Sequence, residues 1–369
     1  MKFGRQLVKI IMLIANLVVA FIMIMTLVGS AVSPEKLILP AYTSLFFPVT
    51  IAINLFFIVF WLLARNWMFL ISFIIIIIAA PHIGNTVPVH FKKPKNIETG
   101  KNITILSYNT KMNDAVLKHT KEKPNKVIQY ILETDADIVC IQEFAVGHKE
   151  TDLTHEDVLR IFSNYKYKQI VYKLSQGWCK YGMAIFSKFP IINKDTIHFI
   201  SDSNISIYSD IVVNNDTIRL ISNHLESNRL TEQDKAKAIE LKNNFDADNL
   251  TETTLQLSRK LGVAYRVRAA QADYLADFIK KSPYKLIAVG DLNDVPSSYV
   301  YTQVKGKNLK DAFAETGTGI GWTFNQFIYR FRIDYVLHDP AFQVVDFHVE
   351  KFRASDHYPI HCNINIPNK

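Results

Sequence analysis

The chain has 369 residues, 49% of them hydrophobic, and its 42 Lys and Arg against 34 Asp and Glu give a net charge of +8. This charge divides evenly, because residues 1–90 hold five basic residues and one acid (+4), which leaves 37 of the 42 basic and 33 of the 34 acidic residues (+4) in 91–369. A soluble part that is only slightly basic argues against a strong polyanion-binding protein, and three scattered cysteines are too few for a disulfide framework or a zinc site.

The first ninety residues carry three apolar runs, at 7–28, 37–63 and 67–83. A bilayer core of about 30 Å needs about 20 helical residues, so the first run is long enough to cross. It is also longer than the roughly 7–15 apolar residues of a signal peptide, which favours an anchor. A buried soluble helical domain would show polar helix faces, and these runs show none. We therefore expect residues 1–83 to form a membrane anchor of about three transmembrane helices.

Three basic residues flank the first run: Lys2, Arg5 and Lys9. The positive-inside rule places them in the cytoplasm, and three crossings of an inner (plasma) membrane then put the rest of the chain outside the cytoplasm. Lysines shortly after the third run argue mildly against this orientation, and if that run does not cross, the large domain is cytoplasmic. We interpret 84–99 as a linker and expect an extracytoplasmic domain over 100–367.

From about residue 100 the sequence alternates short apolar strands with amphipathic helices. The strand-like segments are "NITILSYNT", "ADIVCIQEF", "YGMAIFSKFPI", "TIRLISNHLES", "YKLIAVGDLND" and "FRIDYVLHD", with one more after "ASDHYPI". The segments "PNKVIQYILETD" and "RVRAAQADYLADFIKK" predict helices, and the polar stretch 226–262 predicts an exposed loop before the second helix. This order indicates an α/β or α+β fold.

Polar residues recur where the apolar strands end. They are Asn109, Glu143, His224, Asp291, Asn293, Asp334, Asp356 and His357. Each alone has an ordinary explanation: Asn109 could cap a turn, His224 could be a satisfied half-buried histidine, and Asp334 could pair with Arg332. Active sites of layered α/β proteins gather at strand ends and in the loops that follow, so the whole set predicts one site.

The motifs "LSYN", "DIVCIQE", "YGMAIFSKFPI", "NHLE", "GDLND", "RIDYVL" and "SDHYPI", in this order, resemble the endonuclease/exonuclease/phosphatase (DNase I-like) superfamily. The resemblance covers residues 100–367. It implies a four-layer α/β sandwich, in which two mixed β-sheets pack together with helices outside and the site at one edge. Residues 1–83 would precede this sandwich as transmembrane helices, a layout similar to that of membrane-anchored bacterial VanJ-like proteins, which act on undecaprenyl pyrophosphate.

The resemblance also implies a metal site. Glu143 resembles the main metal carboxylate, Asp356 a second one, and Asn109 the amide beside the metal and phosphate. Mg²⁺ prefers oxygen ligands and keeps several waters, so one or two carboxylates suffice, and Mn²⁺ is an alternative. Abasic-site enzymes of the superfamily carry an Asp where this chain has Lys111, which places the chain nearer the nuclease, sphingomyelinase and phosphatase branches.

The remaining residues of the set resemble catalytic groups. Asp291 and Asn293 match the pair that orients the attacking water and holds a phosphate oxygen, and His224 matches a histidine placed against the phosphate. Asp334 matches the acid that orients the final histidine, His357. Either His357 or Asp291 could accept the proton from water, and the sequence leaves both open.

We expect a membrane-anchored, Mg²⁺-dependent phosphohydrolase that cleaves a phosphoester or pyrophosphate bond, with a membrane lipid as substrate. Alternatives are a phosphodiesterase or endonuclease acting on a sphingomyelin-like lipid or on nucleic acid, and a non-catalytic binding protein with the same fold. A transporter would need charges within the spans, where only Asn16 and Asn54 are notably polar.

Overall fold

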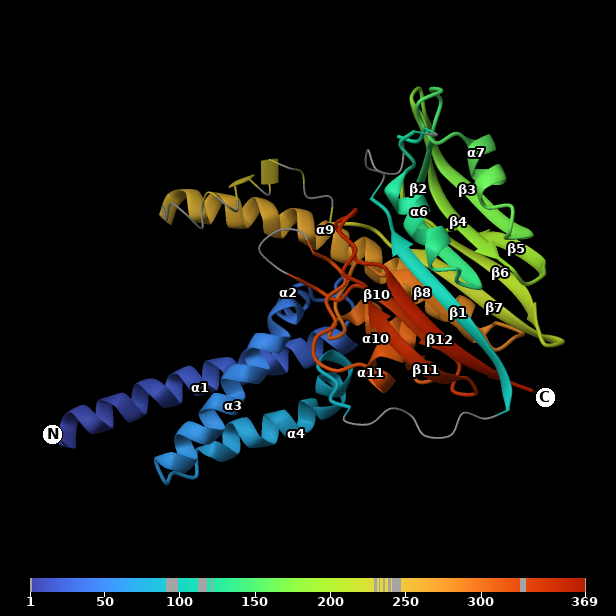
Figure 1. Ribbon diagram of the computed structural model, residues 1–369. Helices are drawn as coiled ribbons and strands as arrows, with labels where there is room; N and C mark the ends of the chain where they lie inside the picture. Colours follow the sequence, from blue (N-terminus) through green and yellow to red (C-terminus); the bar gives the residue numbers. More distant parts are fainter. Residues whose placement is uncertain are drawn as a thin grey trace.

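The computed structural model describes residues 2–90, 99–111, 118–120, 122–228, 247–325 and 330–368, together with a few residues between 231 and 240. Figure 1 shows two parts: a bundle of apolar helices at the N-terminal end and a β-sandwich with helices on its outer faces. The expected linker 84–99 falls largely on 91–98, which lies outside the described residues.

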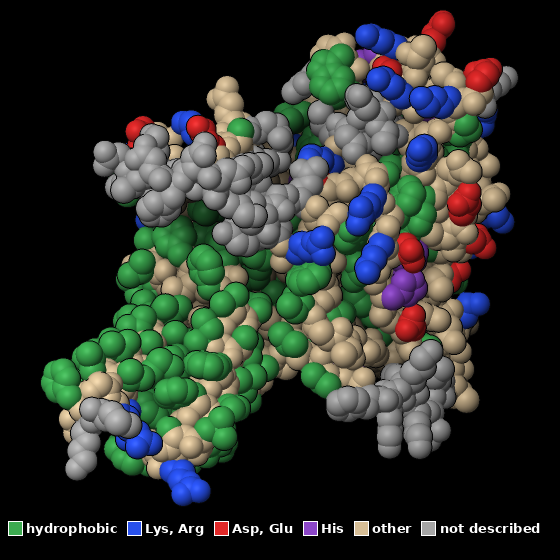
Figure 2. Space-filling model, turned by 60° about the vertical axis from the view of Figure 1, so that its left-hand side comes forward, with side chains coloured by type: hydrophobic (Ala, Val, Ile, Leu, Met, Phe, Trp, Pro, Cys, Tyr) green, Lys and Arg blue, Asp and Glu red, His purple; other side chains and the backbone are tan. Residues whose placement is uncertain are grey.

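The bundle is made of long apolar helices joined by short turns. Its elements are α1 (Lys2–Ala31), α2 (Leu39–Thr43), the 3₁₀ turn η1 (Ser44–Phe46), α3 (Phe47–Leu63) and α4 (Phe69–Thr86). Three stretches are long and apolar enough to cross a membrane: Phe3–Ala31, Leu39–Leu63 and Phe69–Thr86. In Figure 1 the N-terminus and the α3–α4 turn lie at the end of the bundle far from the sandwich, and in Figure 2 the surface of the bundle is almost entirely apolar.

Polar side chains inside the bundle bind one another. Asn16 of α1 donates to the Ser72 hydroxyl of α4 at 2.6 Å, and Ser72 donates to Asn54 of α3 at 2.9 Å. Trp61 Nε1 donates to the Asn16 side chain at 3.0 Å. Apolar helices gain little from packing against each other in lipid, so such hydrogen bonds between helices help to hold them together.

The sandwich contains two six-stranded mixed sheets, which confirms the expected fold class. The strands are β1 (Gly100–Asn109), β2 (Ile138–Gly147), β3 (Tyr167–Gln176), β4 (Cys179–Ser187), β5 (Ile191–Ile197), β6 (Ser206–Val213), β7 (Asp216–His224), β8 (Leu286–Asp291), β9 (Lys310–Asp311), β10 (Asp334–His338), β11 (Gln343–Val349) and β12 (Ile360–Pro367). One sheet has the order β11-β12-β1-β2-β4-β3, and the other β5-β6-β7-β8-β10-β9. The first core fills the space between the sheets, with Ile105 and Met183 from one and Leu220 and Val336 from the other.

Helices cover both outer faces. They are α6 (Lys126–Glu133), α7 (His155–Ile161), α9 (Ala247–Lys280), α10 (Tyr299–Lys305) and α11 (Ala312–Thr316). The second core packs α6 and α7 on the first sheet, through residues such as Ile131 and Val158. The third packs α9 and α10 on the second sheet, through residues such as Leu275 and Val300. The result is the helix–sheet–sheet–helix layering expected for this sandwich.

The prediction of a loop over 226–262 was wrong in its second half, because α9 begins at Ala247. The polar composition of this stretch conceals a helical contact with the anchor. The Tyr42 hydroxyl of α2 donates to the Ser258 carbonyl at 2.7 Å, and the Tyr42 ring packs edge-on against Tyr265 at 5.6 Å. The middle of α9 thus contacts the bundle, and local periodicity could not reveal that partner.

The anchor and the sandwich are joined by direct contacts. The Ser297 hydroxyl, in the segment after β8, donates to the Ser44 carbonyl of η1 at 2.9 Å. The backbone N–H of Gly319 donates to the Pro88 carbonyl at 3.0 Å, and the buried Arg332 donates to the carbonyl of Asn85. The sandwich therefore rests on the end of the bundle, with the segment after β8 at the junction.

Candidate active site

The sheet register brings the strand-end residues together. β1 and β2 are parallel neighbours in the centre of one sheet, and β7 and β8 hold the same place in the other. Their carboxyl ends meet at one edge, where His224 is paired directly with Asp291 and Asp334 with Asp291. Asn109 bridges the two sheets, since its Nδ2 donates to Asp291 Oδ2 at 3.0 Å and to Glu143 Oε1 at 3.3 Å.

Backbone strain gathers at this edge. Of the seven described non-glycine residues with positive φ, three belong to the site or adjoin it: Lys111 (φ 49°), Glu143 (φ 52°) and Asn293 (φ 53°). Glu143 lies where the β2–β4 register shifts between Ile141 and Phe144. Such conformations cost about 1–3 kcal/mol each and persist where the surroundings enforce them. At Glu143 the irregularity interrupts the alternation of the strand and sets the direction of the carboxylate.

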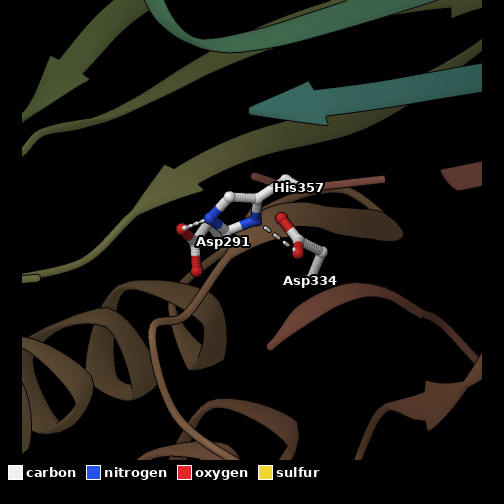
Figure 3. A group of neighbouring side chains, drawn as sticks. All are labelled: Asp291, Asp334 and His357. Carbon is white, nitrogen blue, oxygen red and sulfur yellow. Dashed lines mark hydrogen bonds and ion pairs between the residues drawn. The ribbon is translucent and has the colours of Figure 1, made fainter. Parts of the chain in front are cut away.

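His357 lies between two carboxylates, as Figure 3 shows. Its Nδ1 is 2.8 Å from Asp334 Oδ2, and its Nε2 is 3.7 Å from Asp291 Oδ2. An ionised carboxylate only accepts hydrogen bonds, so Nδ1 carries the proton and donates to Asp334. Burial opposes a charge on the ring, but Asp334 and Asp291 outweigh it and raise the pKa of His357 above its usual value.

Asp291 is the central acceptor of the cluster and is fully buried. Its Oδ2 accepts hydrogen bonds from Asn109 Nδ2 and, at 3.2 Å, from Asn293 Nδ2. Its Oδ1 accepts the Asn293 backbone N–H at 2.7 Å. Burial, and next the charge of Asp334, raise the pKa of Asp291. Asn293 also donates to the Leu225 carbonyl at 3.0 Å, which ties the loop after β8 to the end of β7.

His224 occupies the other side of the cluster. Its Nε2 is 3.4 Å from Glu143 Oε1 and 4.0 Å from Asp291 Oδ2. Burial, with a contribution from the charge on His357, lowers the pKa of His224 to about 3, so this imidazole is neutral at pH 7. The two histidines of the site therefore differ in charge: His357 is held as a cation and His224 is not.

Asp356 joins the cluster through its neighbours. Lys111 Nζ is 2.7 Å from Asp356 Oδ2, and the Ser355 hydroxyl contacts both Asp356 Oδ1, at 3.3 Å, and the Asn109 carbonyl, at 2.8 Å. Burial raises the pKa of the Glu143 carboxyl, and the charges of His357 and Asp356 act on it in opposite directions. All eight residues predicted from the sequence thus lie at one edge of the sandwich.

Two groups of side chains here could hold a metal ion. The ligand atoms of Asp291, Asp334 and His357 all lie within 4.8 Å of one another, but these three already bind each other through both ring nitrogens. The other group, Glu143 and Asp356 with the Asn109 amide, offers hard oxygen donors. An ammonium group, that of Lys111, already contacts Asp356. We favour the second group, because a cation there neutralises carboxylates without breaking the His357–Asp334 hydrogen bond.

Three residues of the site were not predicted from the sequence. Asn204 Nδ2 is 3.0 Å from His224 Nε2, and the Phe324 ring packs edge-on against His357 at 5.2 Å. Ser355 connects Asp356 to Asn109 as described above. Asn204 and Phe324 lie in loops without strand-end motifs, so no sequence signal marks them, whereas Ser355 belongs to the "SDH" motif and could have been included.

Comparison with known proteins places this site in a family. The sequence pattern of the Endonuclease/Exonuclease/phosphatase family matches residues 106–357, and that of a "Domain of unknown function (DUF8431)" matches residues 8–86. No curated protein matches the chain. The first of these patterns spans more than half of the chain, including every residue of the cluster.

Several solved structures are similar to this chain at low sequence identity. The human Nocturnin catalytic domain with bound sulfate anion has 18% identity over 73% of this chain and 96% of that one, with a TM-score of 0.50. D. rerio TDP2 complexed with single-strand DNA product has 16% identity (72% and 100% covered, TM-score 0.48), and a family protein from Leptotrichia buccalis C-1013-b has 15% (72% and 100%, TM-score 0.45). The order of motifs, the two mixed sheets and the matched pattern together show that this chain belongs to the endonuclease/exonuclease/phosphatase family.

Proposed function

We propose that this protein is a membrane-anchored, divalent-metal-dependent hydrolase that cleaves a phosphoester or pyrophosphate bond of a lipid-linked substrate. The observation that carries the proposal is the position of the site relative to the anchor. Asp291 and Asn293 begin the segment that reaches Ser297, and Ser297 is hydrogen-bonded to Ser44 of the bundle. A soluble substrate gives no reason for this junction, whereas a lipid phosphate is concentrated at the membrane surface where the junction lies.

The residues of the cluster suit phosphoryl chemistry. Glu143 and Asp356, with the Asn109 amide, would hold Mg²⁺ or Mn²⁺, and the bound ion would neutralise charge on the phosphoryl oxygens. Asp291 accepts three hydrogen bonds and lies centrally, where it can orient a water and receive its proton. His357 presents Nε2 to the same space and, as a cation, would stabilise the negative charge that develops there. Asp334 holds the His357 ring in place. His224 and Asn293 would contact the phosphate from the other side.

The arrangement of the bundle supports a domain outside the cytoplasm. The N-terminal basic residues and the α3–α4 turn with Arg65 lie at the end of the bundle opposite the sandwich (Figures 1 and 2). The positive-inside rule favours the cytoplasm for that end. We propose that the sandwich faces the outer side of an inner (plasma) membrane.

The test is hydrolysis by the purified full-length protein with Mg²⁺, measured as phosphate released from lipid pyrophosphates and phosphoinositides, phosphocholine released from sphingomyelin, and shortened strands from DNA. We expect turnover of a lipid phosphate or pyrophosphate, loss of activity on removal of the metal by EDTA, and recovery with Mg²⁺ or Mn²⁺. Equal turnover of DNA and lipid pyrophosphate would remove the lipid assignment. Full activity in the presence of EDTA, together with full activity of a Glu143→Gln variant, would exclude a metal ion from the mechanism.

A further inference from the structure

A cavity lies beside the catalytic cluster, and none of the eight residues of the cluster lines it. It has a volume of about 360 Å³, within the range of about 300–1,000 Å³ that small-molecule sites occupy. The residues that give it its character are Trp322, Arg330, Val349, Lys351, Arg353 and Tyr358. We call it the basic pocket, because three of these side chains are cationic and its lining contains no acid.

The basic character comes from the end of β11 and the turn that follows it. Val349, Lys351 and Arg353 line the pocket, whereas Glu350 and Phe352 do not, and the Phe352 N–H donates to the Glu350 carbonyl at 2.9 Å in a tight turn around Lys351. The intervening Phe352 points the other way, where its ring stacks on Tyr130 at 4.2 Å. Glu350, on that same side, acts electrostatically on Tyr130. The segment "VEKFR" therefore turns both of its cations toward the pocket and its acid away.

The positive charge of the pocket is not neutralised from within the described part of the chain. Neither Lys351 nor Arg353 forms an ion pair with any residue that the structure describes, and both are exposed. Arg330 lies over the Trp322 ring at 5.3 Å, which places its guanidinium at the pocket wall. In Figure 2, Lys and Arg side chains are spread over the visible face of the sandwich, from beside the apolar bundle to its upper end.

The pocket adjoins the catalytic histidine. Tyr358 follows His357 directly, and its N–H donates to the Thr323 carbonyl at 2.7 Å. Thr323 Oγ1 accepts the N–H of Asp334 at 3.1 Å, and the next residue, Phe324, packs on the His357 ring. The strip that carries Trp322 thus contacts both members of the His357–Asp334 pair, and the pocket residue Tyr358 is one residue along the chain from the catalytic cluster.

The same strip is held by the anchor. Gly319, three residues before Trp322, donates to the Pro88 carbonyl, and the His90 N–H donates to the Thr318 hydroxyl at 3.3 Å. His90 Nε2 also lies 2.8 Å from the Ala314 carbonyl. One wall of the pocket is therefore connected to the chain that leaves α4.

We propose that the basic pocket binds a second phosphoryl group of the substrate, next to the one that is cleaved, and so selects lipids with two adjacent phosphates over lipids with one. This inference rests on the proposed function. Arg330 and Arg353 match phosphate oxygens with paired N–H donors, and Lys351 adds a point charge. With the terminal phosphate at the catalytic cluster, the phosphate attached to the lipid would lie in the pocket, on the side from which the lipid arrives.

The test compares two substrates with one tail, farnesyl phosphate and farnesyl diphosphate, hydrolysed by the full-length protein in uncharged detergent micelles. The variant Lys351→Gln/Arg353→Gln removes two cations of the pocket. The control Lys285→Gln removes an exposed lysine at the end of β8 opposite Asp291. We expect kcat/KM of the double variant to fall about 10–100-fold on the diphosphate but less than about threefold on the monophosphate, with the control unchanged on both.

Binding gives a second readout that does not need turnover. Inorganic pyrophosphate is titrated into the full-length protein by calorimetry without divalent metal, and the double variant should bind it about tenfold more weakly. Pyrophosphate binding that the double variant weakens, without hydrolysis of either lipid, would overturn the proposed function and leave only the binding of a diphosphate at the basic pocket. Equal losses on both lipids would overturn the inference alone. The lipid assays are repeated in phosphatidylglycerol vesicles, and losses that occur only there would also overturn the inference, because the pocket would then bind a neighbouring headgroup.

Discussion

At the scale of single residues, the site divides labour between groups that differ in charge. His357 bonds Asp334 through one nitrogen and faces Asp291 with the other, while His224 stays neutral. The bond to Asp334 matters because it stabilises the charge on His357 and fixes the ring so that Nε2 faces Asp291. Asp334 in turn is fixed by Thr323 Oγ1, which accepts its backbone N–H.

Replacing His357 with Ala should abolish turnover, and Asp334→Asn should lower kcat by about 10³–10⁴-fold, as the loss of an orienting acid does in hydrolase triads. The measurements are kcat on the preferred lipid phosphate and the melting temperature of each variant. Activity of His357→Ala within about threefold of wild type, at an unchanged melting temperature, would exclude this histidine from the mechanism.

The candidate site was predictable at this scale because its residues follow apolar strands in short motifs. Asp291 and His224 stand at strand ends that the sequence already marks. Asn204 was not predictable, since it reaches His224 from a loop that no local pattern marks. For Lys111, the sequence showed that it differs from the Asp of abasic-site enzymes. It could not show the ion pair with Asp356, because that contact forms between two loops distant in the sequence.

At the scale of elements, the site depends on the central parallel strands of each sheet. Gly290 of β8 pairs with Asn223 of β7 and has a φ of +111°, and a Cβ there would lie 2.3 Å from the Asn223 carbonyl oxygen. The strands β7 and β8 can approach closely at this point only without a side chain. The position of Asp291, one residue on, follows from that approach.

Gly290→Ala should therefore both destabilise the sandwich and disturb the site. A strained φ with a backbone clash costs about 1–3 kcal/mol of unfolding free energy, and we expect a lower melting temperature together with a loss of kcat. The matched control is Gly177→Ala, where a Cβ meets nothing within 4 Å. Equal melting temperatures for the two variants would show that β7 and β8 are not constrained in this way.

At the scale of the whole molecule, the anchor and the sandwich form one packed unit. The contacts that join them were beyond sequence reasoning, because they connect residues such as Ser44 and Ser297, 253 positions apart. Arg332 shows the coupling most clearly: it is 1% exposed, binds Asp311 at 2.8 Å, and donates to the Asn85 carbonyl at the end of α4. It precedes Asp334 by two residues, so anchor and site share this support.

Arg332→Met should lower the free energy of unfolding by about 3–5 kcal/mol, because it leaves the Asp311 carboxylate buried without its cation. Arg160→Met is the control, since the Arg160–Asp157 pair is exposed and such pairs contribute about 0–1 kcal/mol. Thermal unfolding of the full-length variants measures both. Melting temperatures that fall equally would contradict a special role for Arg332.

The orientation of the molecule is tested by fusing alkaline phosphatase after residue 99, since that reporter is active only outside the cytoplasm. We expect an active fusion, because the sandwich lies at the end of the bundle opposite the N-terminal basic residues. An inactive fusion, together with an active cytoplasmic reporter at the same position, would place the sandwich in the cytoplasm and overturn the proposed side of action.

The central claim is that the site works on a lipid phosphate at the surface of its own membrane. The most direct test places the full-length protein in nanodiscs and supplies farnesyl diphosphate either in the same nanodiscs or in separate vesicles, with Mg²⁺ and equal total substrate. Sharing one bilayer raises the effective concentration of the lipid, so phosphate release should be at least about tenfold faster in the shared nanodiscs. Equal rates in the two arrangements, or faster cleavage of DNA than of the lipid in either one, would contradict the claim.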